Sequence, residues 1–565
     1  MRSSRRGVGL TVLATVTALV LTACGGGGTG GGAGDVTGGA AQEGNDINPV
    51  DVAQLRPGGD FLWSIASLPP QYNRIQLDGT EADTRDIMSA VIPILFKGDA
   101  QGVLNADPDY LESAEVTSED PQVITYKLNP DFVWNDGRPA DWTDFEAQWK
   151  ALNGTNEAYQ VAGTTGYTDI SSIEQGATPQ EVVVTFANKF ADWRSLWVPL
   201  YPKETNSDPA VFNEGWLNQP IAGVGAGPFT FESIDPTAQR LILVPNEKWW
   251  GAKPVLDRIV YIGLDDAATP EAFANGSLSF FDIGPSVSNL QRAQQVQGAV
   301  VRTSNGPNYR HITFNGANGA ILSDPALRLA IMKGINRDII LQSQIGPIVP
   351  NAAPLGDHIY VEGQEGYQDN SGIVAYDPDK ARSELDALGW TVQGAVRVKD
   401  GKPLAIRDVI PTGTAVSEAE AKLVQQQLAE IGVQVDIQAV PLDNFFEQFV
   451  HTGNFDITHF SWLGTQTPIS SSSGIYRTGG VNGVEQNYGQ IGSERINQLL
   501  DQANAELDPA KQRELANELD QEIWKVGHSL LLYQRPDAIA VQGNVANFGA
   551  FGFADFDYTK IGFTR

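Results

Sequence analysis

The chain has 565 residues but only one cysteine, Cys24, and this shortage constrains the fold more than any other feature. Without a second cysteine, the chain cannot form an internal disulfide, a thiolate zinc site or an iron-sulfur cluster. Hydrophobic residues make up 41% of the sequence, and a length of this order supports large hydrophobic cores in about three domains. The folded state must therefore depend on core packing.

The segment before Cys24 has the order of an export signal. Three arginines lie among the first six residues, and an apolar run of about fifteen residues follows, which is short for a membrane span. Leu21-Thr22-Ala23-Cys24 then places two small residues before a thiol that can be alkylated by a lipid. We expect residues 1–23 to be a lipoprotein signal peptide, removed so that a two-chain lipid on Cys24 becomes the anchor.

This pattern predicts a protein that lies outside the cytoplasm, anchored to the cell membrane. The alternative is an ordinary secretory signal with an incidental cysteine. Arg5-Arg6 resembles the pair of a twin-arginine signal, but Gly-Val-Gly follows it. The choice between Sec and twin-arginine export therefore stays open.

The sequence is strongly acidic, with a formal net charge of −30. Residues 1–23 contain three arginines and no acidic residue, so their removal gives −33. Such a charge disfavours nucleic acid as a partner. Residues 24–47 are rich in glycine and cannot bury enough apolar surface to fold. We expect them to form a flexible tether from lipidated Cys24, with an end-to-end distance of about 25 Å.

Beyond this tether, short runs rich in Val, Ile, Thr and aromatic residues alternate with amphipathic helices. This alternation predicts a mixed α/β fold. The predicted strands are 122–128, 181–187, 240–244, 258–264, 311–315 and 433–440.

Three predicted helices are marked by residues at their ends. Ser417 and Glu420 have the spacing of a capping box, and Gly432 stands where a left-handed residue ends a helix. Asp377 and Asp508 each precede a proline, which predicts an N-cap followed by proline at the first helical position.

Local motifs for catalysis and cofactors are missing from the sequence. It lacks Gly-x-Ser-x-Gly, a phosphate-binding Gly-x-x-x-x-Gly-Lys-Ser/Thr loop and HExxH. The segment 223–228 superficially resembles a dinucleotide fingerprint, but Pro228 replaces its last glycine and a strand-like run follows. A loop around Gly453 separates His451 from His459, so we expect no metal site. We predict no cofactor and no enzyme activity, although a secreted hydrolase is the alternative because acid pairs are plentiful.

Several segments carry a resemblance to a known family. One example is the Asp136-Gly137 turn, followed by Pro139 and by a helix whose first turn Asp141 and Asp144 cap and charge. The matching segments are 126–129, 132–139, 225–229, 244–251, 314–315, 327–331 with 334–337, and 376–381 with 388–390. In order and spacing they resemble family 5 of the solute-binding proteins of bacterial ABC transporters, which includes oligopeptide- and dipeptide-binding proteins. The similarity covers about residues 61–548.

The resemblance implies a two-lobed α/β fold of the periplasmic-binding-protein type (class II, large cluster), in which hinged lobes close around a ligand. It places lobe I at 48–80, 225–309 and 530–565. An extra inserted domain of that lobe is expected at 81–224, and lobe II at 310–529. The matching motifs belong to the scaffold, where Asn246 is expected to make a loop bond and Arg337 to pair with an acid.

The chain departs from the family at one position of the ligand site. Peptide-binding members place an aspartate a few residues after a Gly-Trp, where it pairs with the free amino group of the peptide. In the matching segment 460–468, Thr465 stands in the place of the acid, and the next acid downstream is Glu485. Because an unpaired buried ammonium is costly, this change favours a capped, cell-wall-derived or nonpeptide solute.

The layout implied by the resemblance also predicts ligand-binding residues at or near the lobe edges. Aromatic rings would offer stacking area, and amide or hydroxyl groups would fix the orientation of the solute. The predicted residues are Trp462, Thr465, Tyr309, Asn308, Tyr72 and Tyr533.

The resemblance therefore implies a monomeric extracytoplasmic receptor, held at the membrane by its lipid anchor. It would trap a peptide or peptide-like solute by lobe closure and deliver it to the permease subunits of an ABC importer. A nonpeptide solute, such as a glycan, a metal chelate or haem, is the alternative within the same role.

Overall fold

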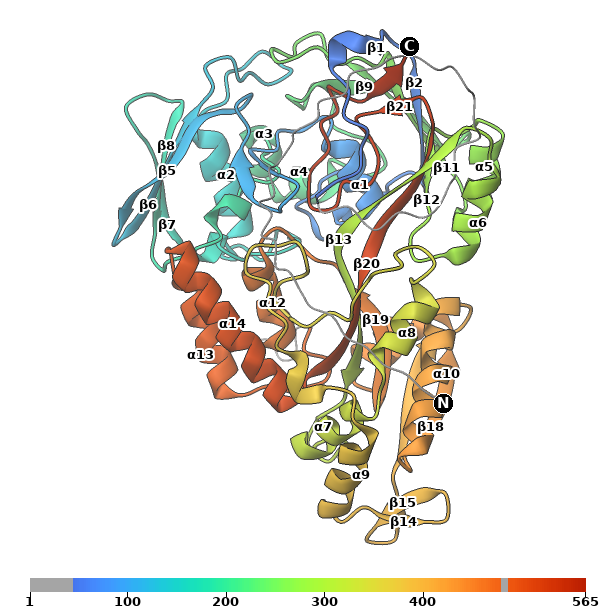
Figure 1. Cartoon of the computed structure of the whole chain (residues 1–565). Coiled ribbons are helices and arrows are strands. Elements are labelled where there is room, and N and C mark those ends of the chain that lie inside the picture. The colour runs from blue at the N-terminus through green and yellow to red at the C-terminus, as the bar shows by residue number, and fades with distance from the viewer. Residues whose placement is uncertain (1–43, 479–485) are drawn as a thin grey trace, which may run out of the picture. The chain divides into compact units, whose positions relative to one another are not determined.

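The structure is a computed structural model that describes residues 44–478 and 486–565 (Figure 1). Cys24, the expected signal peptide and most of the expected tether lie outside the described residues. Within the described ranges, no helix is long and apolar enough to cross a membrane. The described residues form several sheets with packed helices, which confirms the predicted mixed α/β class.

One four-stranded sheet has the order β2-β11-β10-β9. β2 pairs with β11 in parallel, and the other pairs are antiparallel. Phe61, Trp63 and Ile65 alternate on the buried face of β2 and pack into one aromatic-rich core. The strands are β2 (Asp60–Ile65), β9 (Phe229–Asp235), β10 (Arg240–Pro245) and β11 (Arg258–Gly263). A three-stranded sheet contains β1 (Leu55–Arg56), β21 (Val545–Ala546) and β22 (Gly562–Thr564).

A second four-stranded sheet is antiparallel, with the order β5-β6-β8-β7, and α2 (Trp142–Leu152) packs against it. Asp141 and Asp144 cap and charge the first turn of α2, as predicted, and the two residues together form a capping box. The buried Asp144 carboxylate also accepts hydrogen bonds from Trp134 (3.1 Å) and Arg138 (2.6 Å), which ties the preceding turn to the helix. The strands of this sheet are β5 (Leu111–Glu119), β6 (Gln122–Leu128), β7 (Ile170–Gln175) and β8 (Glu181–Phe186). The same part of the chain also contains the paired strands β3 (Phe96–Gly98) and β4 (Leu104–Ala106) and the helices α1 (Ala82–Met88), α3 (Lys203–Asn206) and α4 (Pro209–Glu214).

A six-stranded sheet has the order β12-β20-β13-β19-β17-β18. The long antiparallel strands β13 and β20 run side by side through it (Figure 1). Their register is interrupted between Asn305 and Tyr309. The strands are β12 (Phe280–Asp282), β13 (Ala299–Phe314), β17 (Ala405–Pro411), β18 (Gln434–Val440), β19 (Ile457–Trp462) and β20 (Ser529–Gln542).

Helices cover this sheet and close its hydrophobic core. Val424 and Leu428 of α10 pack with Ile312 and Phe314 of β13 in one cluster. The helices in this half of the chain are α5 (Thr269–Ala274), α6 (Val287–Gln295), α7 (Pro325–Lys333), α8 (Arg337–Gln344), α9 (Pro378–Ala387), α10 (Ala415–Glu430), α11 (Leu442–Asn444), α12 (Pro468–Tyr476), α13 (Glu494–Ala505) and α14 (Pro509–Val526). A small sheet holds β14 (Thr391–Gln393), β15 (Val396–Lys399) and β16 (Lys402–Pro403).

Most local signals in the sequence are confirmed. The six predicted strands coincide with β6, β8, β10, β11, the end of β13, and β18. Asp377 and Asp508 cap α9 and α14, each with proline at the start of the helix. Gly432 follows α10 with a φ of 81°, the left-handed conformation that glycine adopts without strain. Asn246 makes the expected loop bonds, donating to Asn135 and to the Gly227 carbonyl.

Two structural predictions were wrong. Ser417 and Glu420 do not form a capping box, because α10 begins earlier, at Ala415, and both side chains are buried within the helix. They bind Arg310 of β13 instead. Arg337 has no carboxylate partner among its hydrogen bonds in the described residues; it donates to the carbonyls of Leu355 and Leu531 and to a serine hydroxyl.

Candidate functional site

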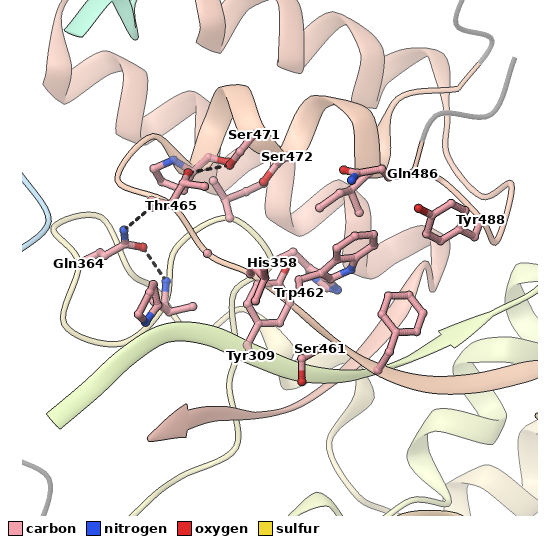
Figure 2. A pocket seen from close by; sticks show the side chains of 18 of the residues that line it. Tyr309, His358, Gln364, Ser461, Trp462, Thr465, Ser471, Ser472, Gln486 and Tyr488 are labelled. Carbon is pink, nitrogen blue, oxygen red and sulfur yellow. Dashed lines mark hydrogen bonds between the residues drawn. The ribbon is translucent and has the colours of Figure 1, made fainter. Parts of the chain in front are cut away.

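A cavity of about 420 Å³ opens beside the six-stranded sheet (Figure 2). Its walls come from β13, β19, α12, the π-helical turn η7 (Phe445–Val450) and three loops. The lining residues are Pro307, Tyr309, His358, Ile359, Val361, Gln364, Phe446, Phe460, Ser461, Trp462, Leu463, Gly464, Thr465, Pro468, Ser471, Ser472, Ile475, Gln486 and Tyr488.

Trp462 is held in a stack of three rings at the wall of this cavity. Its ring lies 5.7 Å from that of His311, tilted by 7°, and 6.0 Å from that of Tyr488, tilted by 20°. Trp462 is also the register partner of Tyr309 across β19 and β13. The indole is therefore oriented before any solute arrives, which reduces the entropy lost on binding.

Thr465 lies at the mouth of the cavity, where its side chain is exposed. Its hydroxyl donates to Ser471 (3.0 Å) and accepts from the Thr467 N–H (3.2 Å). Gln364 donates to the Thr465 carbonyl oxygen (3.4 Å), and Figure 2 shows these groups converging. The polar groups gathered at the mouth are therefore uncharged hydroxyls and amides.

The deep wall of the cavity is a buried chain of hydrogen bonds. The Tyr309 and Tyr476 hydroxyls are 3.4 Å apart, and Tyr476 donates to the His358 carbonyl oxygen. The His358 ring has both nitrogens facing acceptors: Nδ1 is 2.7 Å from Asp520 Oδ1 and Nε2 is 3.3 Å from the Ser529 carbonyl oxygen. A neutral imidazole donates from one nitrogen only, so a proton on Asp520 completes the second bond.

The pKa values of His358 and Asp520 are consistent with this arrangement of protons. Burial lowers the pKa of His358 to about 3, which keeps the ring neutral. Burial raises the pKa of Asp520 to about 7, so its carboxyl is still largely protonated in weak acid. Burial and the neighbouring Asp520 charge raise the pKa of Asp357 in the same way.

This arrangement predicts how stability depends on pH. The folded-state pKa of Asp520 is raised from 3.8 to about 7, so its contribution to stability is fully present below pH 3.8 and is lost as pH rises through about 7. Asp520→Asn should therefore remove part of the fall in unfolding free energy over this interval, as measured by urea unfolding. Asp508→Asn serves as a contrast, because backbone N–H groups lower the pKa of Asp508 and its contribution is lost as pH falls. An unchanged pH slope in Asp520→Asn would contradict the assignment.

The cavity brings together three of the six predicted ligand residues: Trp462, Thr465 and Tyr309. Asn308 is adjacent to it but serves the backbone, accepting the Gly464 N–H at 3.1 Å. Tyr72 is fully buried in another core, where it contacts Phe231 edge to face.

Tyr533 is also buried away from the cavity lining and donates to Glu420 (2.8 Å). Packing accounts for the positions of Tyr72 and Tyr533. Sequence reasoning missed the lining residues His358, Gln364, Ser471 and Tyr488. They come from segments far apart in the chain, and no local pattern marks them.

A charged network lies beneath α10, on strands that also build the cavity. Arg310 donates to Glu420 (2.9 Å) and to Ser417 (2.7 Å). His459 lies between two carboxylates, 3.1 Å from Asp408 and 3.4 Å from Glu420. Burial alone would lower the pKa of His459, but these carboxylates raise it to about 9. The positive charges of Arg310 and His459 therefore compensate the negative charges of Asp408 and Glu420 within the core.

The cavity-lining helix α12 is also contacted by a distant segment. The Asp192 carboxylate accepts the Ser470 N–H at the start of α12 (3.3 Å). Ala191 N–H donates to the Asn504 carbonyl oxygen (2.7 Å), and Gln466 donates to that of Phe553 (3.2 Å). The elements around the cavity are thus bridged to loop residues outside the six-stranded sheet.

The described residues contain no cluster of three or more His, Cys, Asp or Glu side chains suited to hold a metal ion. The cavity instead offers stacking surfaces and neutral hydrogen-bonding groups. Such a lining suits reversible binding of an organic solute.

Comparison with known proteins identifies the family. Residues 105–483 match the family model described as "Bacterial extracellular solute-binding proteins, family 5 Middle". The chain is 42% identical over 524 residues to the oligopeptide-binding protein OppA of Mycobacterium tuberculosis, covering 92% of this chain and 87% of the relative.

Solved structures give the same result for the fold. A periplasmic EDTA-binding protein, EppA, superposes with a TM-score of 0.83 at 25% identity, over 92% of this chain and 98% of the other. The oligopeptide-binding protein AppA of Bacillus subtilis, in complex with a nonapeptide, superposes with a TM-score of 0.73 at 19% identity, over 90% and 100%. The fold is therefore the two-lobed one of periplasmic binding proteins, and the chain belongs to family 5 of the bacterial extracellular solute-binding proteins.

Proposed function

We propose that this protein captures a peptide or peptide-like solute outside the cytoplasm and delivers it to an ABC importer. The observation that carries the proposal is the cavity at Trp462, with its preformed ring stack and uncharged polar groups. The 42% identical relative, which is named an oligopeptide-binding protein, supports the choice of a peptide. The receptor acts as a monomer without covalent chemistry.

Closure of two lobes is the proposed mechanism. The division places lobe I at 48–80, 225–309 and 530–565, with the inserted domain at 81–224 and lobe II at 310–529. Support comes from the sheets, because β2-β11-β10-β9 and β5-β6-β8-β7 fall within the first lobe and its insertion. Among the strands of the described residues, β13 and β20 alone cross between the proposed lobes, and their interrupted register offers a hinge.

Two hydrogen bonds, one to the start of α12 and one to α13, support the proposal that these helices take part in lobe closure. Asp192 and Ala191 belong to the proposed inserted domain, whereas Ser470 and Asn504 belong to the proposed lobe II. Because α12 also lines the cavity, a solute that orders this helix would favour the docked arrangement. The importer would then recognise the closed form. Cys24, lying outside the described residues, is proposed to carry the lipid that keeps the receptor at the membrane.

The proposal predicts that peptides co-purify with the protein. The full chain, purified in detergent, is denatured and its bound solutes are identified by mass spectrometry. Synthetic copies are then added back, and a peptide at 100 times its Kd should raise the unfolding free energy by about 2.7 kcal/mol. Bound solutes without peptide bonds would contradict the peptide assignment. Turnover of the added peptide would point to a hydrolase instead.

A further inference from the structure

The described lining of the cavity contains no Asp, Glu, Lys or Arg side chain. Its one imidazole, that of His358, is engaged at both nitrogens within the wall. The remaining polar side chains are hydroxyls and amides, which can each donate and accept hydrogen bonds. Apart from the hydroxyls of Tyr309 and Tyr488 and the indole N–H of Trp462, they are Gln364, Ser461, Thr465, Ser471, Ser472 and Gln486.

The deep part of this cavity is also shielded from water. Tyr309, Ser472 and Ile475 are 6%, 5% and 7% exposed. An ammonium or carboxylate placed there would lose its hydration without gaining a counter-charge, which is strongly unfavourable. An uncharged amide would lose less, because the hydroxyls and amides of the wall can replace its water.

Two buried carboxyl groups that bond to the His358 segment, those of Asp520 and Asp357, are already occupied. Asp520 accepts the His358 N–H and the Asn370 amide, both at 2.8 Å, in addition to its contact with the imidazole. Asp357 accepts the N–H groups of Ile359 and Tyr360 at 2.7 and 3.0 Å. Neither lines the cavity, so neither is available to pair with a cation in it.

The mouth of the cavity carries exposed apolar side chains beside its polar groups. Leu463 is 75% exposed and Phe446 is 42% exposed, and both line the cavity. Trp462 and Tyr488 add aromatic surface to the same cavity (Figure 2). A solute that fills the cavity therefore meets apolar contact area together with hydrogen bonds from uncharged groups, as an acylated amide would.

We propose that the cavity takes the uncharged, N-acylated end of a peptide and selects against a free amino terminus. The inference rests on the proposed peptide function and deepens it. The acyl group packs against the rings and Leu463, and the amide bonds to the hydroxyl side chains of Thr465, Ser471 and the buried Ser472. Thr465 is the specificity-determining position, because an acid at this mouth would supply the missing counter-charge.

The test compares two forms of one peptide library. Random hexapeptide amides are prepared with free or acetylated amino termini, mixed in equal amounts and offered to the full chain after removal of co-purified solutes. Mass spectrometry of the retained peptides gives the ratio of acetylated to free forms. We expect at least about a tenfold excess of acetylated peptides, given the cost of an unpaired buried charge. Equal retention or an excess of free peptides would overturn this inference and leave the peptide function standing.

Two variants of matched size sharpen the test. Thr465→Asp keeps an acceptor for the Thr467 N–H and adds a charge, whereas Thr465→Asn adds none. Because Thr465 is exposed, both should fold as the parent does. Thr465→Asp should shift the ratio toward free peptides by at least about tenfold, while Thr465→Asn keeps the parental preference. Equal shifts in both variants would contradict the electrostatic basis. Retention of neither library would overturn the peptide function itself, and this inference with it.

Discussion

Replacing Arg310 by leucine should lower the free energy of unfolding by about 3–5 kcal/mol, the usual cost of leaving one partner of a buried ion pair alone. Glu420 and the Arg310 guanidinium are almost wholly inaccessible to water, at 0% and 8% side-chain exposure. Without the arginine, the Glu420 carboxylate keeps only Tyr533 and His459 as partners. Urea unfolding at pH 7 measures the loss.

The control for this prediction is an exposed pair. Arg495 contacts Glu518 between α13 and α14, with both side chains over 40% exposed. Arg495→Leu should change the unfolding free energy by no more than about 1 kcal/mol, because solvent screens surface pairs. A similar small change in Arg310→Leu would show that the buried network does not support the fold.

The same network has a predicted pH dependence. Burial alone would raise the pKa of Glu420, but Arg310 and His459 lower it to about 2. Its contribution is therefore present above pH 4.5 and is lost as pH falls toward 2. The pKa of His459 is raised from 6.5 to about 9, so its contribution is complete below 6.5 and is lost as pH rises through about 9. Arg310→Leu should therefore reduce the loss of unfolding free energy that occurs as the pH falls from 4.5 toward 2.

Replacing Trp462 by alanine should raise the Kd of a bound peptide by about 30- to 1,000-fold, or about 2–4 kcal/mol, as expected for an aromatic anchor. Trp462 lines the cavity and is held there by His311 and Tyr488. Isothermal titration with the tightest peptide from the co-purified set measures the effect.

Trp462 also packs against hydrophobic cores, so its loss will reduce stability. Trp390→Ala is the matched control, because Trp390 is likewise half-buried against a core but does not line the cavity. It should reduce stability while leaving the Kd within about twofold. If Trp462→Ala loses stability but keeps the parental Kd, Trp462 is a core residue rather than a ligand anchor.

Local signals in the sequence located many elements because they act over a few residues. Asp377 and Asp508 cap their helices through N–H groups in the next turn, so their effect is readable from spacing alone. The family resemblance supplied the larger arrangement, since the scaffold motifs keep their order along the chain.

Long-range contacts set the limit of sequence reasoning. Ser417 and Glu420 have capping-box spacing, but Arg310, more than one hundred positions earlier, binds both inside the core. Likewise, Tyr533 lies near the predicted lobe boundary in the sequence, which suggested a ligand-binding role. In the structure its hydroxyl donates a hydrogen bond to Glu420 instead. The pairing of these residues depends on the register of β13 with β20, which no local pattern contains.

The same limit applies to the cavity. Trp462 and Thr465 were found because one short segment matched a family motif. His358 and Tyr488 reach the same cavity from separate loops, and only the folded chain brings them to Trp462. The uncharged character of the described lining is therefore a property of the assembled structure.

The most direct test of this account is a crystal structure of the full chain with the tightest co-purified peptide. We expect the peptide to lie in the cavity beside Trp462, with its end at Thr465 and with the two lobes closed on it. A peptide bound elsewhere, with the cavity at Trp462 filled only by solvent, would contradict the assignment of the solute-binding site.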